Sequence, residues 1–153
     1  MLKMLFGILI VAAILIPNFL WMAFPPTTVS KHEEQPESQV RKIMTVIENL
    51  GRIGCFILPI FFEPEINGVF EVVALMMMVL SLVIYYGGWT RYFIRGREYE
   101  LLFQSLWKIP LPMAVAPIIY FFGAVVILHS LVLLVAVILL ALGHLYISHY
   151  DSK

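Results

Sequence analysis

Long apolar runs separated by short polar segments dominate the chain. A helix that crosses the hydrocarbon core of a bilayer, about 30 Å thick, needs roughly 20 apolar residues. Three runs of this kind predict membrane spans at about 4–24, 47–62 and 69–89. The pattern indicates an all-α integral membrane protein, folded as a compact bundle of transmembrane helices in a single domain.

The last apolar run is too long to be one span. From Leu111 to Ile147 no residue carries a fixed charge, and a helix of that length would measure about 55 Å. Tilting absorbs only part of such an excess. Two spans at 111–128 and 131–148, joined by a turn at His129 and Ser130, fit better, although that turn has no Gly or Pro. We therefore expect five spans, with four as the alternative.

The segments between the runs predict how the helices begin and end. We expect a kink at Pro17 in the first span, which we interpret as an uncleaved helix. Residues 25–41 form a polar loop, and Ser38 is a suitable N-cap for a helix that enters the membrane from its interface. Apolar and polar residues alternate over 98–108 in a pattern that predicts a short interfacial helix.

Composition supports the membrane class and narrows the partners. Of the 153 residues, 61% are hydrophobic and 13% are charged, whereas soluble domains are nearer 45–50% and about 25%. The formal net charge is zero, so no global field attracts nucleic acid. The single cysteine, Cys55, excludes an intrachain disulfide, and its apolar surroundings predict a buried hydrophobe.

Charges in the loops predict the orientation. The linker 63–68 has two acids and no base, whereas the segments flanking the second and third spans are rich in Lys and Arg. The positive-inside rule places loops 25–41 and 91–108 in the cytoplasm and linker 63–68 outside. Five spans then put the N-terminus outside and the C-terminus inside. The aromatic belt at the inner interface would hold Trp21, Trp89, Trp107, Tyr146 and Tyr150.

Ionisable groups at membrane depth are costly, so each is a candidate site. Glu48 and Arg52 are spaced to pair on one helix face, with Asn49 beside them, and Gly51 and Gly54 would let another helix approach closely. This group could bind an anion or a lipid headgroup, or act as a proton-linked carboxylate. The alternative is a structural ion pair near the cytoplasmic interface.

Three further residues complete the candidate intramembrane set. Glu71 lies near the outer end of the third span, and together with Glu63, Glu65 and His129 it could form an outer acidic cluster. His144 lies in the last span and could relay protons. We expect no metal, because the zinc-binding His-Glu-x-x-His arrangement is missing. No motif for a cofactor is present either.

The basic segment after the third span has its own candidate role. Arg91, Arg95 and Arg97 suit contact with anionic lipid headgroups at the cytoplasmic face. A phosphate-bearing substrate is the alternative, because arginine binds phosphate through a bidentate fork.

Three kinds of function are compatible with this pattern. We favour a small transporter or channel-like protein that works as an oligomer, because proline and polar residues interrupt the spans. An accessory subunit of a larger membrane complex needs no site of its own. A membrane-embedded enzyme acting on an anionic lipid would use the interfacial arginines with Glu48 as a base. Since no catalytic motif is present, an enzyme is not our first expectation.

Overall fold

The computed structural model describes residues 2–28, 38–106 and 109–152. Within these ranges the chain is helical and has no β-strand. An antiparallel β-bridge pairs Leu106 with Ile109. The α-helices are α1 (Leu2–Ala23), α2 (Gln39–Ile57), α3 (Val69–Ile94), α4 (Pro112–Ile127) and α5 (Leu131–Asp151), and the short 3-10 helices are η1 (Leu58–Phe61) and η2 (Tyr99–Leu102).

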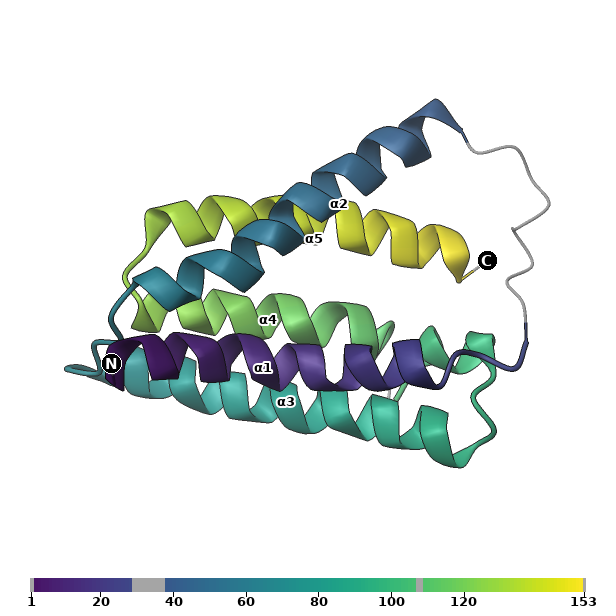
Figure 1. Cartoon of the computed structure of the whole chain (residues 1–153), viewed down its shortest axis with the longest axis horizontal. Coiled ribbons are helices and arrows are strands. Elements are labelled where there is room, and N and C mark those ends of the chain that lie inside the picture. The colour runs from purple at the N-terminus through teal and green to yellow at the C-terminus, as the bar shows by residue number, and fades with distance from the viewer. Residues whose placement is uncertain (1, 29–37, 107–108, 153) are drawn as a thin grey trace.

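The helices lie side by side, and consecutive helices run in opposite directions along the bundle (Figure 1). α2 packs on α5, α3 packs on α4, and α4 and α5 pack on each other, while α1 meets η1 and α3. The N-terminus lies at one end and the C-terminus at the other. The linker between η1 and α3 and the turn between α4 and α5 share the first end, where the Glu65 amide donates to the Ile127 carbonyl at 2.9 Å.

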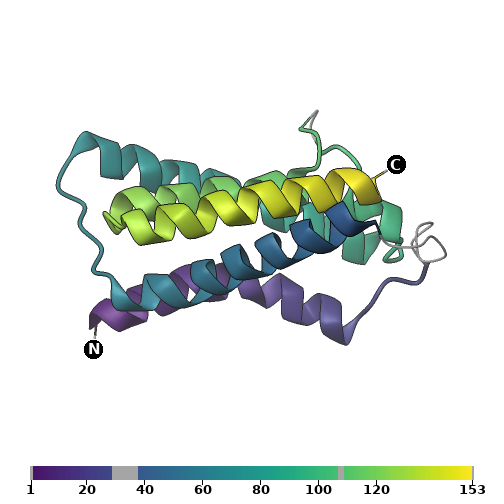
Figure 2. The same ribbon diagram turned by 90° about the horizontal axis from the view of Figure 1, so that it is seen from above.

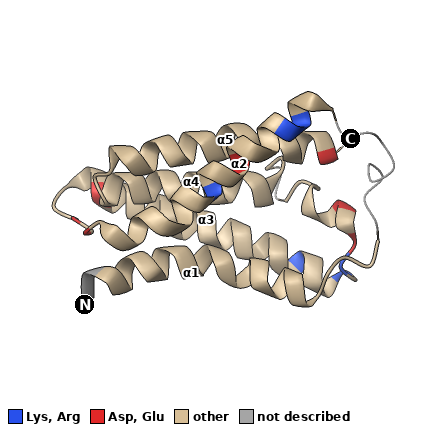
Figure 3. Ribbon diagram, turned by 45° about the horizontal axis from the view of Figure 1, so that its top comes forward, with Lys and Arg blue, Asp and Glu red and all other residues tan. Residues whose placement is uncertain are grey.

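Four helical segments are long and apolar enough to cross a membrane: Met4–Ala23, Gln39–Phe61, Val69–Ile94 and Leu131–Asp151. The fifth apolar helix, α4, has 16 residues. Large apolar side chains cover the outer surface of the bundle, as at Phe70 and Met76. Charged residues gather toward the two ends, apart from a pair in the middle of α2 (Figure 3).

The expected break in the last apolar run is present. α4 ends at Ile127 and α5 begins at Leu131. His129 has a φ of 46°, and histidine enters this left-handed region more readily than most residues. The Ser130 side chain caps α5 by accepting from the Leu133 amide at 3.2 Å. A turn without Gly or Pro is therefore built from a histidine and a capping serine.

The helix starts and bends follow the sequence in other places. Ser38 caps α2, because its side chain accepts from the Arg41 amide. α1 continues through Pro17, and its two halves diverge in direction in Figure 2. The polar loop expected at 25–41 lies largely outside the described residues, which resume at Ser38.

Helix α3 continues beyond the expected span 69–89 to Ile94, and the fully buried Tyr92 extends its packed face. One expectation at this end of the bundle is wrong. The interfacial helix expected over 98–108 is reduced to the single turn η2. The Arg91 guanidinium donates to the carbonyls of Leu101, Gln104 and Ser105, each at 2.8 Å. Because these carbonyls point toward Arg91, the chain after η2 folds around its guanidinium instead of continuing as a helix.

The prediction that Trp89 belongs to an aromatic belt at the membrane interface is also wrong. Trp89 is 7% exposed and packs in the interior against Tyr85, Tyr92 and Phe93. Trp21 is on the surface, and Trp107 lies outside the described residues. An aromatic residue near the end of an apolar run can therefore belong to the core, which the linear pattern does not reveal.

Candidate functional site

Glu48, Arg52 and His144 form a polar triad inside the bundle. Arg52 Nη2 donates to Glu48 Oε1, and His144 Nδ1 lies 2.8 Å from the same oxygen. The Glu48 side chain is only 8% exposed, against 24% for His144 and 45% for Arg52. With a neutral imidazole the triad has no net charge, and one additional proton gives it a charge of +1.

The three residues meet because small residues bring α2 and α5 together. A Cβ atom at Gly51 would lie 2.2 Å from the Leu140 amide nitrogen, and one at Gly143 would lie 2.5 Å from the Glu48 amide nitrogen. A Cβ atom at Gly54 would lie 2.5 Å from that of Ala136. This glycine seam (Gly51, Gly54 and Gly143) brings the two backbones close, as small residues do between membrane helices. It places His144 directly over Glu48.

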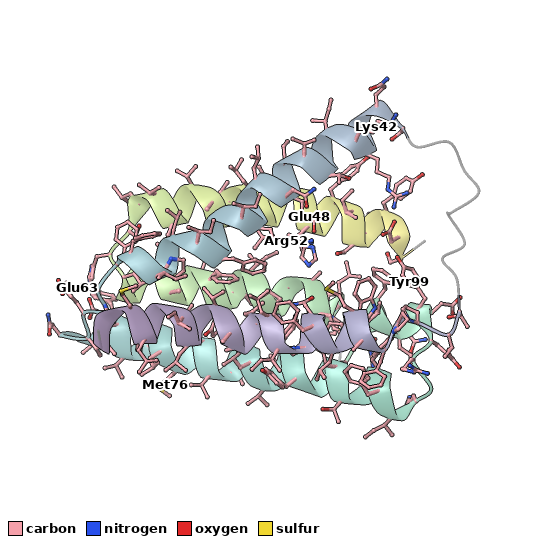
Figure 4. All side chains as sticks on the ribbon, in the orientation of Figure 1. Lys42, Glu48, Arg52, Glu63, Met76 and Tyr99 are labelled. Carbon is pink, nitrogen blue, oxygen red and sulfur yellow. The ribbon has the colours of Figure 1, made fainter. Side chains whose placement is uncertain are left out.

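The triad lies in the wall of a cavity of about 500 Å³, within the range of roughly 300–1,000 Å³ usual for ligand pockets. Every α-helix contributes to the lining, and Figure 4 shows Glu48 and Arg52 on α2 where this helix faces the rest of the bundle. Most of the wall is apolar, with these aromatic side chains: Phe19, Trp21, Phe56, Tyr85, Trp89, Tyr99, Phe103 and Phe121. The arrangement suits a ligand with an apolar body and one polar group.

The cavity opens between α1 and α2. Phe19 and Met22 of α1 line it and are 60% and 70% exposed, and Arg52 of α2 is half-exposed on the other side of the opening. Toward the end that carries the C-terminus, α2 diverges from α1 (Figure 1). The opening therefore faces sideways out of the bundle.

A second polar group lies across the cavity, at the proline bend of α1. Pro17 has no N–H to donate to the Ala13 carbonyl, and the Tyr86 hydroxyl of α3 donates to that carbonyl at 2.9 Å instead. The Asn18 amide donates to the Ile14 carbonyl at 2.8 Å and to the Tyr85 hydroxyl at 2.9 Å. A tyrosine of α3 thus satisfies the backbone carbonyl that proline leaves without its usual donor.

A cluster of charged and polar groups lies at the end of the cavity nearest the C-terminus. Arg41 Nη2 lies 2.9 Å from Asp151 Oδ1, and its guanidinium lies over the Tyr150 ring at 4.9 Å. The Tyr99 hydroxyl donates to the other Asp151 oxygen at 3.4 Å. This cluster ties the start of α2 to the end of α5, and Asp151 and Tyr99 both line the cavity.

The other predicted site residues lie elsewhere. Asn49 is exposed and does not line the cavity. Glu71 and His129 are at the opposite end of the bundle, with 3.4 Å between Oε1 and Nε2. Among the described residues, no three His, Cys, Asp or Glu side chains are placed to hold a metal ion.

The three arginines expected to contact lipid headgroups have different surroundings. Arg91 is occupied by the carbonyls of the following loop. Arg95 is exposed at the C-terminal end of α3. Arg97 is partly buried, and its carbonyl accepts from the Thr27 amide at 3.0 Å. Of the three, Arg95 has the side chain most open to a headgroup.

Sequence reasoning identified the members of the triad but not their meeting. The spacing of Glu48 and Arg52 predicts their pair, whereas nothing in the spacing links either residue to His144. It also missed Tyr85, Tyr99 and Asp151 as cavity residues. A comparison of the chain with models of known protein families, with curated proteins and with solved structures found no match.

Proposed function

We propose that the protein is a small membrane transporter whose amphipathic substrate occupies the cavity and whose cycle is linked to protonation of the triad. The observation that carries this proposal is the cavity itself. Its wall is apolar and aromatic, and a hydrogen-bonded carboxylate and imidazole lie in it near the middle of α2. Glu48 lies nine residues from the start of α2, or about 14 Å along the helix.

The triad offers a place for a proton in the membrane interior. Glu48 Oε1 accepts from both partners, which holds His144 in an orientation where Nε2 can gain or lose a proton. The groups that face the triad are Tyr85 of α3, which interacts electrostatically with Arg52, and the Asp151–Arg41 pair toward the C-terminal end of the cavity.

We also propose that the chain crosses the membrane five times, with α4 as the additional span. Its 16 residues span about 24 Å, and most of its side chains are buried between neighbours, so protein shields it from lipid. The end that carries Arg41, Arg95 and Arg97 would face the cytoplasm. A cavity enclosed by one short bundle suits assembly of two or more copies around a pathway.

Proton-linked transport can be measured in proteoliposomes that enclose a pH-sensitive dye. Octyl sulfate and octyltrimethylammonium are suitable probes, because their permanent charges slow their passage through protein-free bilayers. The wild type should give a probe-dependent pH change, and Glu48→Gln should reduce it at least tenfold. Glu71→Gln, which removes the carboxylate at the other end of the bundle, should leave it intact. Equal flux in Glu48→Gln and wild type would refute the role of the triad.

A second candidate is a membrane enzyme that cleaves an ester. Ser148 lies four residues after His144, is buried and lines the same cavity, and a histidine oriented by a carboxylate is the usual base for a serine nucleophile. No hydrogen bond joins the Ser148 hydroxyl to His144 among the described residues, so we rank this function second. Hydrolysis of a lipid ester that is lost in Ser148→Ala, with no probe-dependent flux in the wild type, would favour it.

A further inference from the structure

The charged surface of the cavity selects the sign of its ligand. Arg52 is the most exposed of the charged side chains that line the cavity, at 45%, whereas the carboxylates of Glu48 and Asp151 are 8% and 10% exposed. Both carboxylates are also covered by basic partners, Arg52 and Arg41 respectively. The most exposed charge in the cavity is therefore positive, although the formal charges of its lining sum to −1 with a neutral imidazole.

Arg52 has unused hydrogen-bonding capacity. A guanidinium carries several N–H donors in a planar fork, and among the described residues only Nη2 is bonded, to Glu48. Arg52 is 13 residues from the start of the Gln39–Phe61 span and nine from its end. A cation at this depth is costly without further acceptors, and an anionic oxygen group supplies them in the geometry that arginine binds best.

The rest of the cavity fits the remainder of such a ligand. Beyond Arg52 the wall consists mainly of aromatic and aliphatic side chains from α1, α3 and α4, such as Phe19, Trp89 and Phe121. The sideways opening between α1 and α2 lets a chain extend toward lipid. A ligand with an anionic head and a single apolar chain would meet a complementary surface at both ends.

We infer that the cavity binds an amphipathic anion, whose carboxylate, phosphate or sulfate head lies on Arg52 and whose apolar chain lies along the aromatic wall. The inference rests on the proposed transporter and names its substrate class. Binding of a proton and binding of the anion then favour each other. A proton on the triad weakens the ion pair between Glu48 and Arg52, and the guanidinium that is released binds the anion. The protonated triad, with its charge of +1, and a monovalent anion together carry no net charge.

The test uses brominated chains, which quench tryptophan fluorescence at short range, because Trp21 and Trp89 both line the cavity. Purified full-length protein in a neutral detergent is titrated with bromododecyl phosphate and with bromododecyltrimethylammonium, which share one chain and differ in charge. We expect saturable quenching by the phosphate with at least tenfold higher affinity than by the ammonium compound. Equal or stronger binding of the ammonium compound would overturn the inference.

Variants of Arg52 distinguish binding of the probe at the site from its partition into detergent micelles. Arg52→Gln should weaken binding of the phosphate at least tenfold, and Arg52→Lys, which keeps the charge, should restore part of it. Arg95→Gln is the matched control, because Arg95 is exposed but outside the cavity. Each variant is first checked for helicity by circular dichroism. If Arg52→Gln fails to fold, wild-type binding of the two probes still decides the sign of the ligand.

The source of the anion is distinguished with lipid nanodiscs. Quenching by brominated phosphatidylglycerol that depends on Arg52 would identify a membrane lipid as the ligand, whereas quenching by single-chain phosphate alone would identify a free amphiphile. Quenching that is the same in wild type and Arg52→Gln for every anion would overturn the site. Anion binding that depends on Arg52, without any flux in proteoliposomes, would refute the transporter and leave this inference standing.

Discussion

At the scale of single residues, the glycines of the seam between α2 and α5 have the clearest consequence. A side chain at Gly51 or Gly143 would collide with backbone atoms of the facing helix at 2.2 and 2.5 Å. Backbone cannot move aside as a flexible side chain can, so the helices would have to separate. That separation would also pull His144 away from Glu48.

We predict that Gly51→Ala and Gly143→Ala each lower the free energy of unfolding by about 1–3 kcal/mol. The measurement is a denaturant titration in mixed micelles followed by circular dichroism. Gly68→Ala is the control, since its Cβ would approach only the end of the Glu71 side chain. A loss at Gly68 as large as at Gly51 would show that alanine is destabilising here for reasons other than the seam.

At the scale of secondary-structure elements, α1 is held by hydroxyl groups that reach its backbone. Tyr86 donates to the Ala13 carbonyl that Pro17 leaves free, and Tyr120 of α4 donates to the Ile10 carbonyl at 3.1 Å. The two bonds differ in one respect. The Ile10 carbonyl lies one turn before Ile14, which has an N–H, whereas the Ala13 carbonyl lies one turn before proline.

This difference predicts a coupling between Tyr86 and Pro17. Tyr86→Phe should cost about 0.6 kcal/mol in the wild-type chain, a typical value for a hydrogen bond between membrane helices. In a Pro17→Ala background the restored N–H satisfies Ala13, so the same change should cost little. Tyr120→Phe should cost the same in both backgrounds. A double-mutant cycle in micelles measures all three, and additive costs for Tyr86 and Pro17 would contradict the explanation.

The elements also show what the sequence could predict. The five helices, the Ser38 cap and the Glu48–Arg52 pair follow from local spacing, because each depends on residues within a few positions of one another. The meeting of Glu48 with His144 and the burial of Trp89 could not be predicted. Both depend on which helix lies against which, and the glycines of α2 show only that some helix comes close.

At the scale of the whole molecule, the order of the helices predicts which loops share a side of the membrane. The linker between η1 and α3 and the turn between α4 and α5 lie at one end of the bundle, and the segment around η2 lies at the other (Figure 1). Asn67, Ser105 and Leu131 are all exposed, so a cysteine at each can report its side.

In a Cys55→Ala background, we expect Asn67→Cys and Leu131→Cys to react with an impermeant maleimide added outside intact cells. Ser105→Cys should react only after the cells are permeabilised. Cys55 is fully buried, so its replacement should disturb the surface little. Labelling of positions 67 and 131 from opposite sides would contradict the five-span arrangement, and labelling of position 105 from outside would invert the orientation.

The sideways opening between α1 and α2 changes how occupancy of the cavity should be reckoned. A compartment that communicates with the bilayer equilibrates with the mole fraction of ligand in the lipid, and only indirectly with its concentration in water. The amphipathic ligand that we propose would accumulate in lipid, so a modest intrinsic affinity would be enough to fill the cavity. Adding empty vesicles at constant total ligand should then lower the mole fraction of ligand in the lipid. Occupancy of the cavity should fall with it, even though no competitor is present in the aqueous phase.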